Sequence, residues 1–274
     1  MIEKMKSFIR KHKLLYRILA GTYRNTIYLV KCGYVKSMIG YLLKTAGPEK
    51  KKLRAMGYTK PKAFKSKTWR IGKGLDGAQR RYYTAYKDGK KVFIKVAKFD
   101  ATIRNEIELA QYLQDYSLDF VCPVVQYEKN FAPDTMMLAN AYLDGVSSLK
   151  LPENAQDFAG LCDQFLHILQ QLDHCGVIHA DVHKNNLMLI DEKCLVLFDF
   201  GISMIKGQKN SIDYVARPGT FYTMPEQGRR VYDDAYSFVM QMQKLGLPEA
   251  WQSIPQYQAI KNAIGHNVGV VDLQ

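Results

Sequence analysis

The residues that could do chemistry stand out most clearly between positions 179 and 201. Asp181 lies in a pattern H-x-D-x-x-x-x-N that begins at His179 and ends at Asn186. A carboxylate there can accept or orient the proton of an attacking hydroxyl, and an amide oxygen is a ligand suited to Mg²⁺. Asp199 follows thirteen positions after Asn186, at the end of an apolar run and with Gly201 beyond it for a turn. A carboxylate so placed suits a metal that bridges phosphates, so these residues predict phosphoryl transfer to a hydroxyl.

A glycine-rich stretch upstream could bind phosphate. Gly72, Gly74 and Gly77 form a G-x-G-x-x-G, in which missing side chains let backbone N–H groups approach phosphate oxygens. A dinucleotide-binding fold would require a helix directly after these glycines. The chain continues instead as two alternating segments, which favours a strand-turn-strand flap.

The second of these segments ends its apolar run at Lys95. Alternation places Lys95 and Phe93 on one face of the strand, so the ammonium is expected to point inward and to need a balancing charge. Glu106 on the following helix is the partner we expect, because it would fix the ammonium over the phosphates. Glu108 is the alternative partner.

These side chains need an element order in which strands come first and helices later. Alternation at 80–89 and 90–99, with Asp88-Gly89 between them, predicts a β-hairpin. Apolar spacing predicts the other elements: a helix at 104–116, a strand at 136–143, a helix at 155–174, strands at 187–190 and 195–198, and helices at 232–245 and 256–264. This order is typical of an α+β fold with a strand-rich lobe followed by a helical one.

The positive charge is concentrated near the N-terminus. The 274 residues carry a formal net charge of +13, but residues 1–75 hold 20 Lys and Arg against 2 acidic residues, which leaves −5 for residues 76–274. Residues 1–43 mix apolar and basic positions, with no run of the ~18 apolar residues that a spanning helix needs. We expect helices that lie either on an anionic membrane surface or on the protein's own body. Nucleic acid is the less favoured partner.

The five cysteines are widely separated and include no C-x-x-C pair. This spacing argues against a zinc or redox motif and favours a reducing cytosol. We therefore expect a cytoplasmic protein, with peripheral attachment to the inner face of the membrane if the basic segment binds lipid.

With these motifs assembled, the chain resembles the protein-kinase-like superfamily from about residue 69 to residue 245. The resemblance implies an N-lobe at 67–143, a C-lobe at 144–274, and a basic amphipathic helical extension at 1–66. It also implies ATP and Mg²⁺ as cofactors in the cleft between the lobes. The implied roles are Gly72, Gly74 and Gly77 over the phosphates, Lys95 paired with Glu106, Ala141 and Leu143 in the hinge that reads adenine, Asp181 as the catalytic aspartate, and Asn186 and Asp199 as Mg²⁺ ligands; His179 would be a scaffold residue.

The nature of the acceptor divides these expectations. Residues 219–227 resemble the end of the activation segment of serine/threonine protein kinases, which makes Thr220 a candidate catalytic residue. Asp234 resembles the start of their central lower-lobe helix. His183, however, stands where protein kinases usually place a phosphate-contacting lysine, and Lys184 has only the neighbouring place; such a histidine is similar to kinases of small molecules and lipopolysaccharide-core sugars.

Three functions follow in order. We expect an ATP- and Mg²⁺-dependent phosphotransferase acting on a serine or threonine of a protein. The alternative is a kinase of a lipopolysaccharide-core or other envelope glycolipid sugar at the membrane surface, and the third is a pseudokinase scaffold. Ala180 replaces an arginine, which argues against gating by phosphorylation of the activation segment. The chain ends about forty residues after Asp234, so we expect a helical lobe truncated after its central helix.

Overall fold

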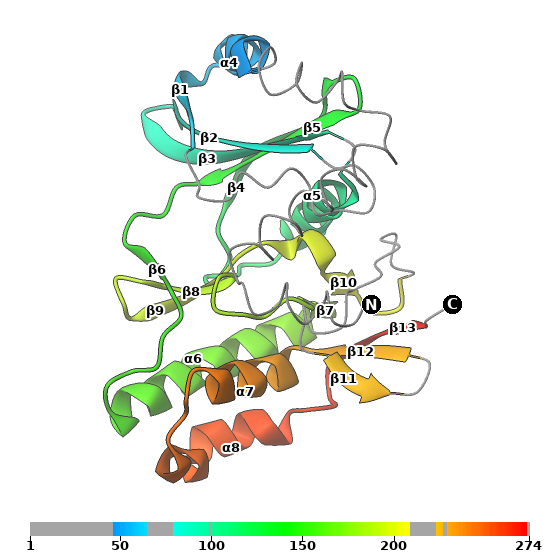
Figure 1. Cartoon of the computed structure of the whole chain (residues 1–274). Helices are drawn as coiled ribbons and strands as arrows, with labels where there is room; N and C mark the ends of the chain where they lie inside the picture. The colour runs from blue at the N-terminus through cyan, green and yellow to red at the C-terminus, as the bar shows by residue number, and fades with distance from the viewer. Residues whose placement is uncertain (1–45, 65–78, 99, 209–222, 227–228, 273–274) are drawn as a thin grey trace, which may run out of the picture.

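The structure is a computed structural model that describes residues 46–64, 79–98, 100–208, 223–226 and 229–272. These residues form a strand-rich N-lobe above a larger, mainly helical C-lobe (Figure 1). The predicted α+β, two-lobed kinase-like fold is confirmed. No helix in the described ranges combines the length and the apolar character needed to cross a membrane.

The N-lobe is built on one antiparallel sheet of five strands, in the order β1-β2-β3-β5-β4. The strands are β1 (Thr59–Ala63), β2 (Gln79–Lys87), β3 (Lys90–Lys98), β4 (Val124–Ala132) and β5 (Thr135–Ala141). β2 and β3 form the predicted hairpin, with Asp88 and Gly89 at φ values of 50° and 77° in its turn. Glycine, and to a lesser degree aspartate, tolerates this left-handed region, so the dipeptide fixes the register of the hairpin.

Two helices cover opposite faces of this sheet. α4 (Ala46–Ala55) and the residues after it bury Leu53 and Tyr58 against Ile94 and its neighbours on one face. α5 (Ala101–Leu113) packs Ile103 and Ile107 on the other face. Because side chains alternate along β3, Ile94 faces α4 while Lys95 lies on the side of α5. The sheet therefore aims the lysine at the lobe interface.

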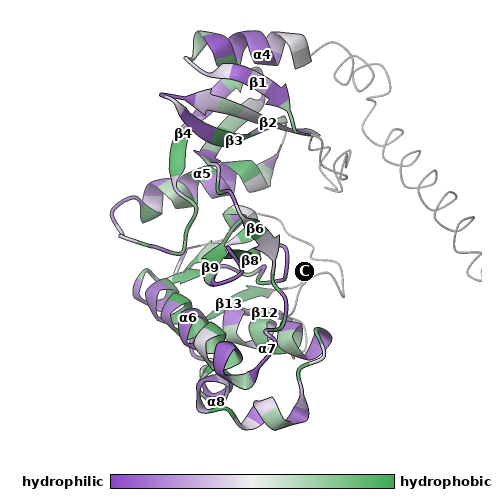
Figure 2. Ribbon diagram, turned by 90° about the vertical axis from the view of Figure 1, so that its left-hand side faces the viewer, coloured by the Kyte–Doolittle hydropathy of each residue, from purple (hydrophilic) through white to green (hydrophobic). Residues whose placement is uncertain are grey.

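The start of the N-lobe differs from the predicted boundary. The expected extension at 1–66 would leave β1 and α4 outside the domain, yet β1 pairs with β2 and α4 closes the core of the lobe. In Figure 2 the outer side of α4 is mainly hydrophilic, in keeping with the exposure of Lys51 and Lys52. We therefore propose that the domain begins no later than Ala46. The helices expected at 1–43 lie outside the described residues.

α5 also begins earlier than predicted. The apolar spacing suggested 104–116, but the helix runs from Ala101 because the Asp100 side chain accepts a hydrogen bond from the Thr102 N–H. An aspartate at this position satisfies one of the unpaired donors of the first turn. The cap places Glu106 in the middle of the helix, opposite β3.

The upper part of the C-lobe carries short strands around a long helix. α6 spans Ala155–His174, as predicted, and β8 (Leu187–Ile190) and β9 (Cys194–Leu197) form a hairpin. β6 (Val146–Ser148) adds to β8 as the third strand. After β9 the chain makes a 3-10 turn, η1 (Phe200–Ile202), and β10 (Met204–Ile205) pairs with β7 (Val177–Ile178).

The lower part of the C-lobe combines two helices with a small sheet. α7 (Asp234–Lys244) starts two residues later than predicted, because β12 (Arg229–Asp233) pairs with both β11 (Thr223–Glu226) and β13 (Val268–Asp272). Asp233 caps α7 by accepting from the Tyr236 N–H. The chain continues through η2 (Glu249–Ser253) and α8 (Pro255–Asn262), which packs on α6 and α7.

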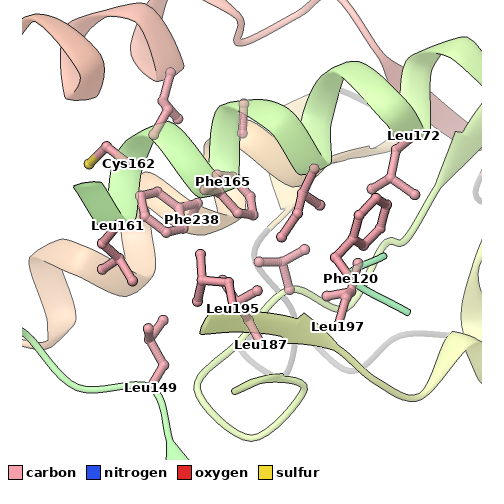
Figure 3. Close-up of a cluster of buried hydrophobic side chains, with 14 of the residues drawn as sticks. Phe120, Leu149, Leu161, Cys162, Phe165, Leu172, Leu187, Leu195, Leu197 and Phe238 are labelled. Carbon is pink, nitrogen blue, oxygen red and sulfur yellow. The ribbon is translucent and has the colours of Figure 1, made fainter. Parts of the chain in front are cut away.

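One apolar core joins these elements (Figure 3). Phe165 of α6 and Phe238 of α7 stack with ring centroids 4.0 Å apart and are fully buried. Leu187 and Leu197 bring the β8-β9 hairpin onto the same cluster. The hairpin is therefore held on a rigid helical base, and it delivers the loops at its two ends to the lobe interface.

Candidate active site

Lys95 stands between two carboxylates from different elements. Its Nζ is 2.8 Å from both carboxylate oxygens of Glu106 on α5 and 3.1 Å from Oδ1 of Asp199. The side chains of Lys95 and Glu106 are 18% and 9% exposed, whereas that of Asp199 is 49% exposed. The expected Lys95–Glu106 ion pair is therefore present, and Glu108 is exposed.

The charges in this group stabilise one another. Burial alone would lower the pKa of Lys95, but the charges of Asp199 and Glu106 outweigh it and hold the pKa above its usual value. In return, the Lys95 ammonium lowers the pKa of Asp199. Lys95 is thus a cation and Asp199 an anion near neutral pH, as phosphate and metal binding would require.

The loop from 179 to 186 is held in an unusual backbone conformation. Ala180 has a φ of 66°, a left-handed value that is costly for a residue other than glycine. The Asp234 carboxylate at the start of α7 accepts hydrogen bonds from the His179 N–H at 2.7 Å and the Ala180 N–H at 2.9 Å. Asp234 therefore supports the conformation from below.

His179 has a structural environment, in line with the scaffold role expected for it. Its Nε2 lies 2.9 Å from the Phe198 carbonyl oxygen, and its ring packs edge-on against Phe200. Burial lowers the pKa of His179 to about 4, so the imidazole is neutral near pH 7. It links the 179–186 loop to the segment that carries Asp199.

Asp181 and Asn186 lie at the lobe interface and contact each other. Asn186 Nδ2 donates to Asp181 Oδ2 at 2.8 Å and to the Asp181 carbonyl oxygen at 3.1 Å. Asp181 Oδ1 is buried without a hydrogen-bond partner among the described residues. Burial, reinforced by the charge of Asp199, raises the pKa of Asp181 to about 8. An unpaired buried oxygen and the Asn186 amide oxygen leave acceptor capacity for a hydroxyl and a cation.

The two basic candidates of the loop differ in their positions. His183 Nε2 lies 3.6 Å from Asp181 Oδ1, beyond hydrogen-bond distance, and burial lowers the pKa of His183. The Lys184 side chain is exposed and does not line the cleft cavity described next. The structure thus brings His183, but not Lys184, next to Asp181.

A cavity of about 520 Å³ lies between the lobes. Its walls include Lys95, Asn186, Asp199 and the hinge residues 140–146. In the hinge, the Ala141 N–H donates to the Pro123 carbonyl and the Tyr142 N–H donates to the Lys91 carbonyl. No described residue accepts from the Leu143 N–H. The hinge therefore offers this donor to a ligand, on the same cavity that holds the charged group.

A second cavity of about 440 Å³ adjoins the first and was not anticipated from the sequence. It extends from Glu106 along α5 towards Tyr116, and four residues line both cavities: Cys122, Asn140, Phe198 and Asp199. Burial raises the pKa of Cys122 to about 11. The thiol and the Asn140 side chain thus stand at the passage between the two spaces.

Four of the predicted site residues cannot be located. Gly72, Gly74 and Gly77, expected over the phosphates, and Thr220, expected beside the catalytic loop, lie outside the described residues. Their roles stay predictions.

Three contributors to the site were missed by reasoning from the sequence. Asp234 was expected only to mark the start of a helix, although two adjacent aspartates before a helix are a signal for a cap and one further acceptor. Asn105 donates to carbonyl oxygens of the turn after Asp199, and Arg80 pairs with the Asp100 cap of α5. Both contacts join segments distant in the sequence, so no local pattern reveals them.

Comparison with known proteins agrees with this geometry. Residues 97–217 match the family described as the ABC1 atypical kinase-like domain. The probable serine/threonine-protein kinase mkcE of Dictyostelium discoideum is 27% identical over 165 residues, which cover 58% of this chain and 22% of that protein. Another probable serine/threonine-protein kinase of this organism is 31% identical over 140 residues, 48% of this chain and 10% of the relative.

These matches span only a fifth and a tenth of the relatives' own lengths. They fall on a chain whose two lobes enclose a cavity bordered by Lys95, Asp199 and the Asn186 end of the 179–186 loop. By fold, by site and by these relatives, the chain belongs to the protein-kinase-like superfamily.

Proposed function

We propose that the protein transfers the γ-phosphate of ATP, with Mg²⁺, to a hydroxyl acceptor. The observation that supports this most directly is the position of Lys95, whose ammonium bridges Glu106 and Asp199 on the wall of the interlobe cavity. Phosphoryl transfer requires a fixed cation for the phosphates and oxygen ligands for the metal, and both meet here.

The chain's own residues divide the work as follows. Lys95, oriented by Glu106, binds the phosphates as a point charge. Asp199 and the Asn186 amide oxygen would hold Mg²⁺, which neutralises charge that develops on the transferred group. Asp181 accepts or orients the proton of the acceptor hydroxyl through its unpaired Oδ1. A pKa of about 8 in the free protein suits a group that must bind and release a proton near neutral pH.

Serine or threonine of a protein is the acceptor that we propose. The sequence at 219–227 resembles the substrate-aligning segment of serine/threonine kinases, and the curated relatives are named as kinases of that class. The second candidate is a sugar hydroxyl of an envelope glycolipid. It is favoured by His183 beside Asp181 and by the basic residues at 1–75.

A labelling experiment separates these acceptors. The full chain and its Asp181→Asn variant are incubated with γ-labelled ATP, Mg²⁺ and an extract of the producing cells, and protein is then separated from glycolipid. We expect label in the protein fraction, reduced at least a hundredfold by Asp181→Asn because general-base assistance is lost. Asp191→Asn is the matched control, since Asp191 is exposed and does not line the cavity.

The outcomes are distinct. Label that appears only in glycolipid establishes the second candidate. If the unchanged chain binds ATP but labels neither fraction, the protein is a scaffold and the proposal fails. Equal labelling by the Asp181→Asn variant removes Asp181 from the mechanism.

A further inference from the structure

Asn105 joins α5 to the turn that follows Asp199. Its Nδ2 lies 2.9 Å from the Ser203 carbonyl oxygen and 3.3 Å from those of Phe200 and Gly201. An amide nitrogen has two hydrogens, so three acceptors share two donors. The next residue along the helix is Glu106, which holds Lys95. Adjacent positions of α5 thus contact the two sides of the site.

The turn also lies very close to the first turn of α5. A side chain on Gly201 would bring its Cβ within 3.1 Å of the Thr102 Cβ and 3.3 Å of the Thr102 carbonyl oxygen. Such distances are shorter than ordinary carbon contacts, so only glycine fits without a shift of the backbone. The carbonyl groups that Asn105 binds are therefore fixed against the helix.

The start of α5 is tied to the sheet as well. Arg80 of β2 donates to the Asp100 carboxylate and, at 2.7 Å, to the Thr102 hydroxyl. Asp100 in turn accepts from the Thr102 N–H and hydroxyl. α5 is consequently anchored to β2, to Lys95 of β3 and to the Asp199 turn, all through described residues.

We propose that Asn105 is a positioning residue, which keeps the 199–203 turn on α5 so that the Asp199 carboxylate stays beside Lys95 before nucleotide or metal binds. The acceptors are backbone carbonyls, so the contact fixes the path of the chain and not one side-chain rotamer. Without it, the turn could leave α5 while Lys95 and Glu106 remained paired. The inference rests on the proposed function for its catalytic meaning, but the position of the turn can be tested without it.

Hydrogen exchange in the nucleotide-free, metal-free full chain provides that test. Asn105→Asp keeps the size of the side chain but replaces both donors with a carboxylate that faces three carbonyl oxygens. We expect amide exchange in residues 200–205 to accelerate by about tenfold or more, given the usual net value of a hydrogen bond. Exchange in the β8-β9 hairpin should change little. Asn105→Gln, which keeps the donors, should partly restore protection, and Arg104→Ala on the exposed side of α5 should have no effect.

A second measurement connects the turn to the metal. In the Asn105→Asp chain, the Mg²⁺ concentration for half-maximal phosphate transfer should rise about ten- to hundredfold, while metal-free ATP binding to Lys95 stays unchanged. If the unchanged chain transfers no phosphate, the proposed function fails and the exchange result still decides the role of Asn105. Unchanged exchange at 200–205, or equally faster exchange throughout the C-lobe, would overturn the positioning role.

Discussion

Asp181 lies in surroundings that favour its neutral form. It is largely buried, Asp199 adds negative charge nearby, and one of its oxygens has no partner among the described residues. The hydrogen bond from Asn186 opposes these effects only in part. A group so placed costs stability whenever it is ionised, and such a cost is typical of functional carboxylates.

This cost predicts a pH-dependent gain of stability in the Asp181→Asn variant. Below about pH 4 the aspartate is neutral in both the folded and the unfolded chain, so the variant and the unchanged protein should differ little. As the pH rises, the unfolded aspartate ionises first, because the folded pKa is raised to about 8, and the unchanged protein loses stability over this interval. Asparagine does not titrate. The melting temperature of Asp181→Asn should therefore exceed that of the unchanged chain by a margin that grows from pH 4 to pH 8.

Thermal unfolding followed by circular dichroism at pH 5 and pH 8 checks this expectation. Asp191→Asn, at an exposed position, serves as the control and should show no such trend. A margin that is constant or shrinks as the pH rises contradicts the assigned environment of Asp181.

At the scale of elements, the start of α7 supports the 179–186 loop. Asp234 is buried, and each of its oxygens accepts one backbone N–H of that loop. Asp234→Ala would leave the His179 and Ala180 N–H groups buried without an acceptor. An unsatisfied buried donor costs about 1 to 3 kcal/mol, so we expect the free energy of unfolding to fall by about 2 to 4 kcal/mol, with loss of phosphate transfer.

Urea denaturation measures this loss, and Asp234→Asn provides the graded comparison. Asparagine keeps one acceptor oxygen, so its effect should lie between those of aspartate and alanine. If alanine and asparagine were both as stable as the unchanged protein, Asp234 would not hold the loop.

The elements with local signals were predicted well from the sequence. Asp88-Gly89 and the alternation around it define the β2-β3 hairpin, and the apolar spacing of α6 gives both of its ends. The start of α7 was predicted too early, because Tyr232 belongs to β12 and pairs with Gly269, a partner 37 residues away. Helical periodicity in a short window contains no information on such a pairing.

The same distinction applies to the site. Alternation along one strand was enough to turn Lys95 inward, and the next helix supplied Glu106 at the expected place. The contacts of Asn105 and Asp234 are different, since they reach backbone groups of a loop that only the tertiary fold brings near. Side-chain identity alone does not predict which carbonyl or N–H a residue will meet.

At the scale of the whole molecule, the N-lobe depends on the segment before residue 67. Leu53 and Tyr58 are fully buried, and β1 covers the edge of β2. A chain starting at residue 46 should therefore unfold at nearly the same temperature as the full chain. A chain starting at residue 67 should lose several kcal/mol, since it loses buried side chains and exposes an edge strand.

Thermal unfolding and size-exclusion chromatography of the two shortened chains give the answer. We expect the chain from 46 to stay monodisperse and the chain from 67 to aggregate or melt at a much lower temperature. Equal melting temperatures for both would restore the boundary at 67 suggested by the sequence.

The two adjoining cavities also define what an inhibitor of this protein could exploit. A compound that occupies the hinge region and passes between Cys122 and Asn140 would reach a space along α5 beyond the first cavity. The thiol on this route is a poor target for electrophilic warheads, because a pKa of about 11 keeps it protonated at physiological pH. Selectivity would therefore have to come from the shape of the passage and from the Asn140 carboxamide, with reversible compounds as the starting chemistry.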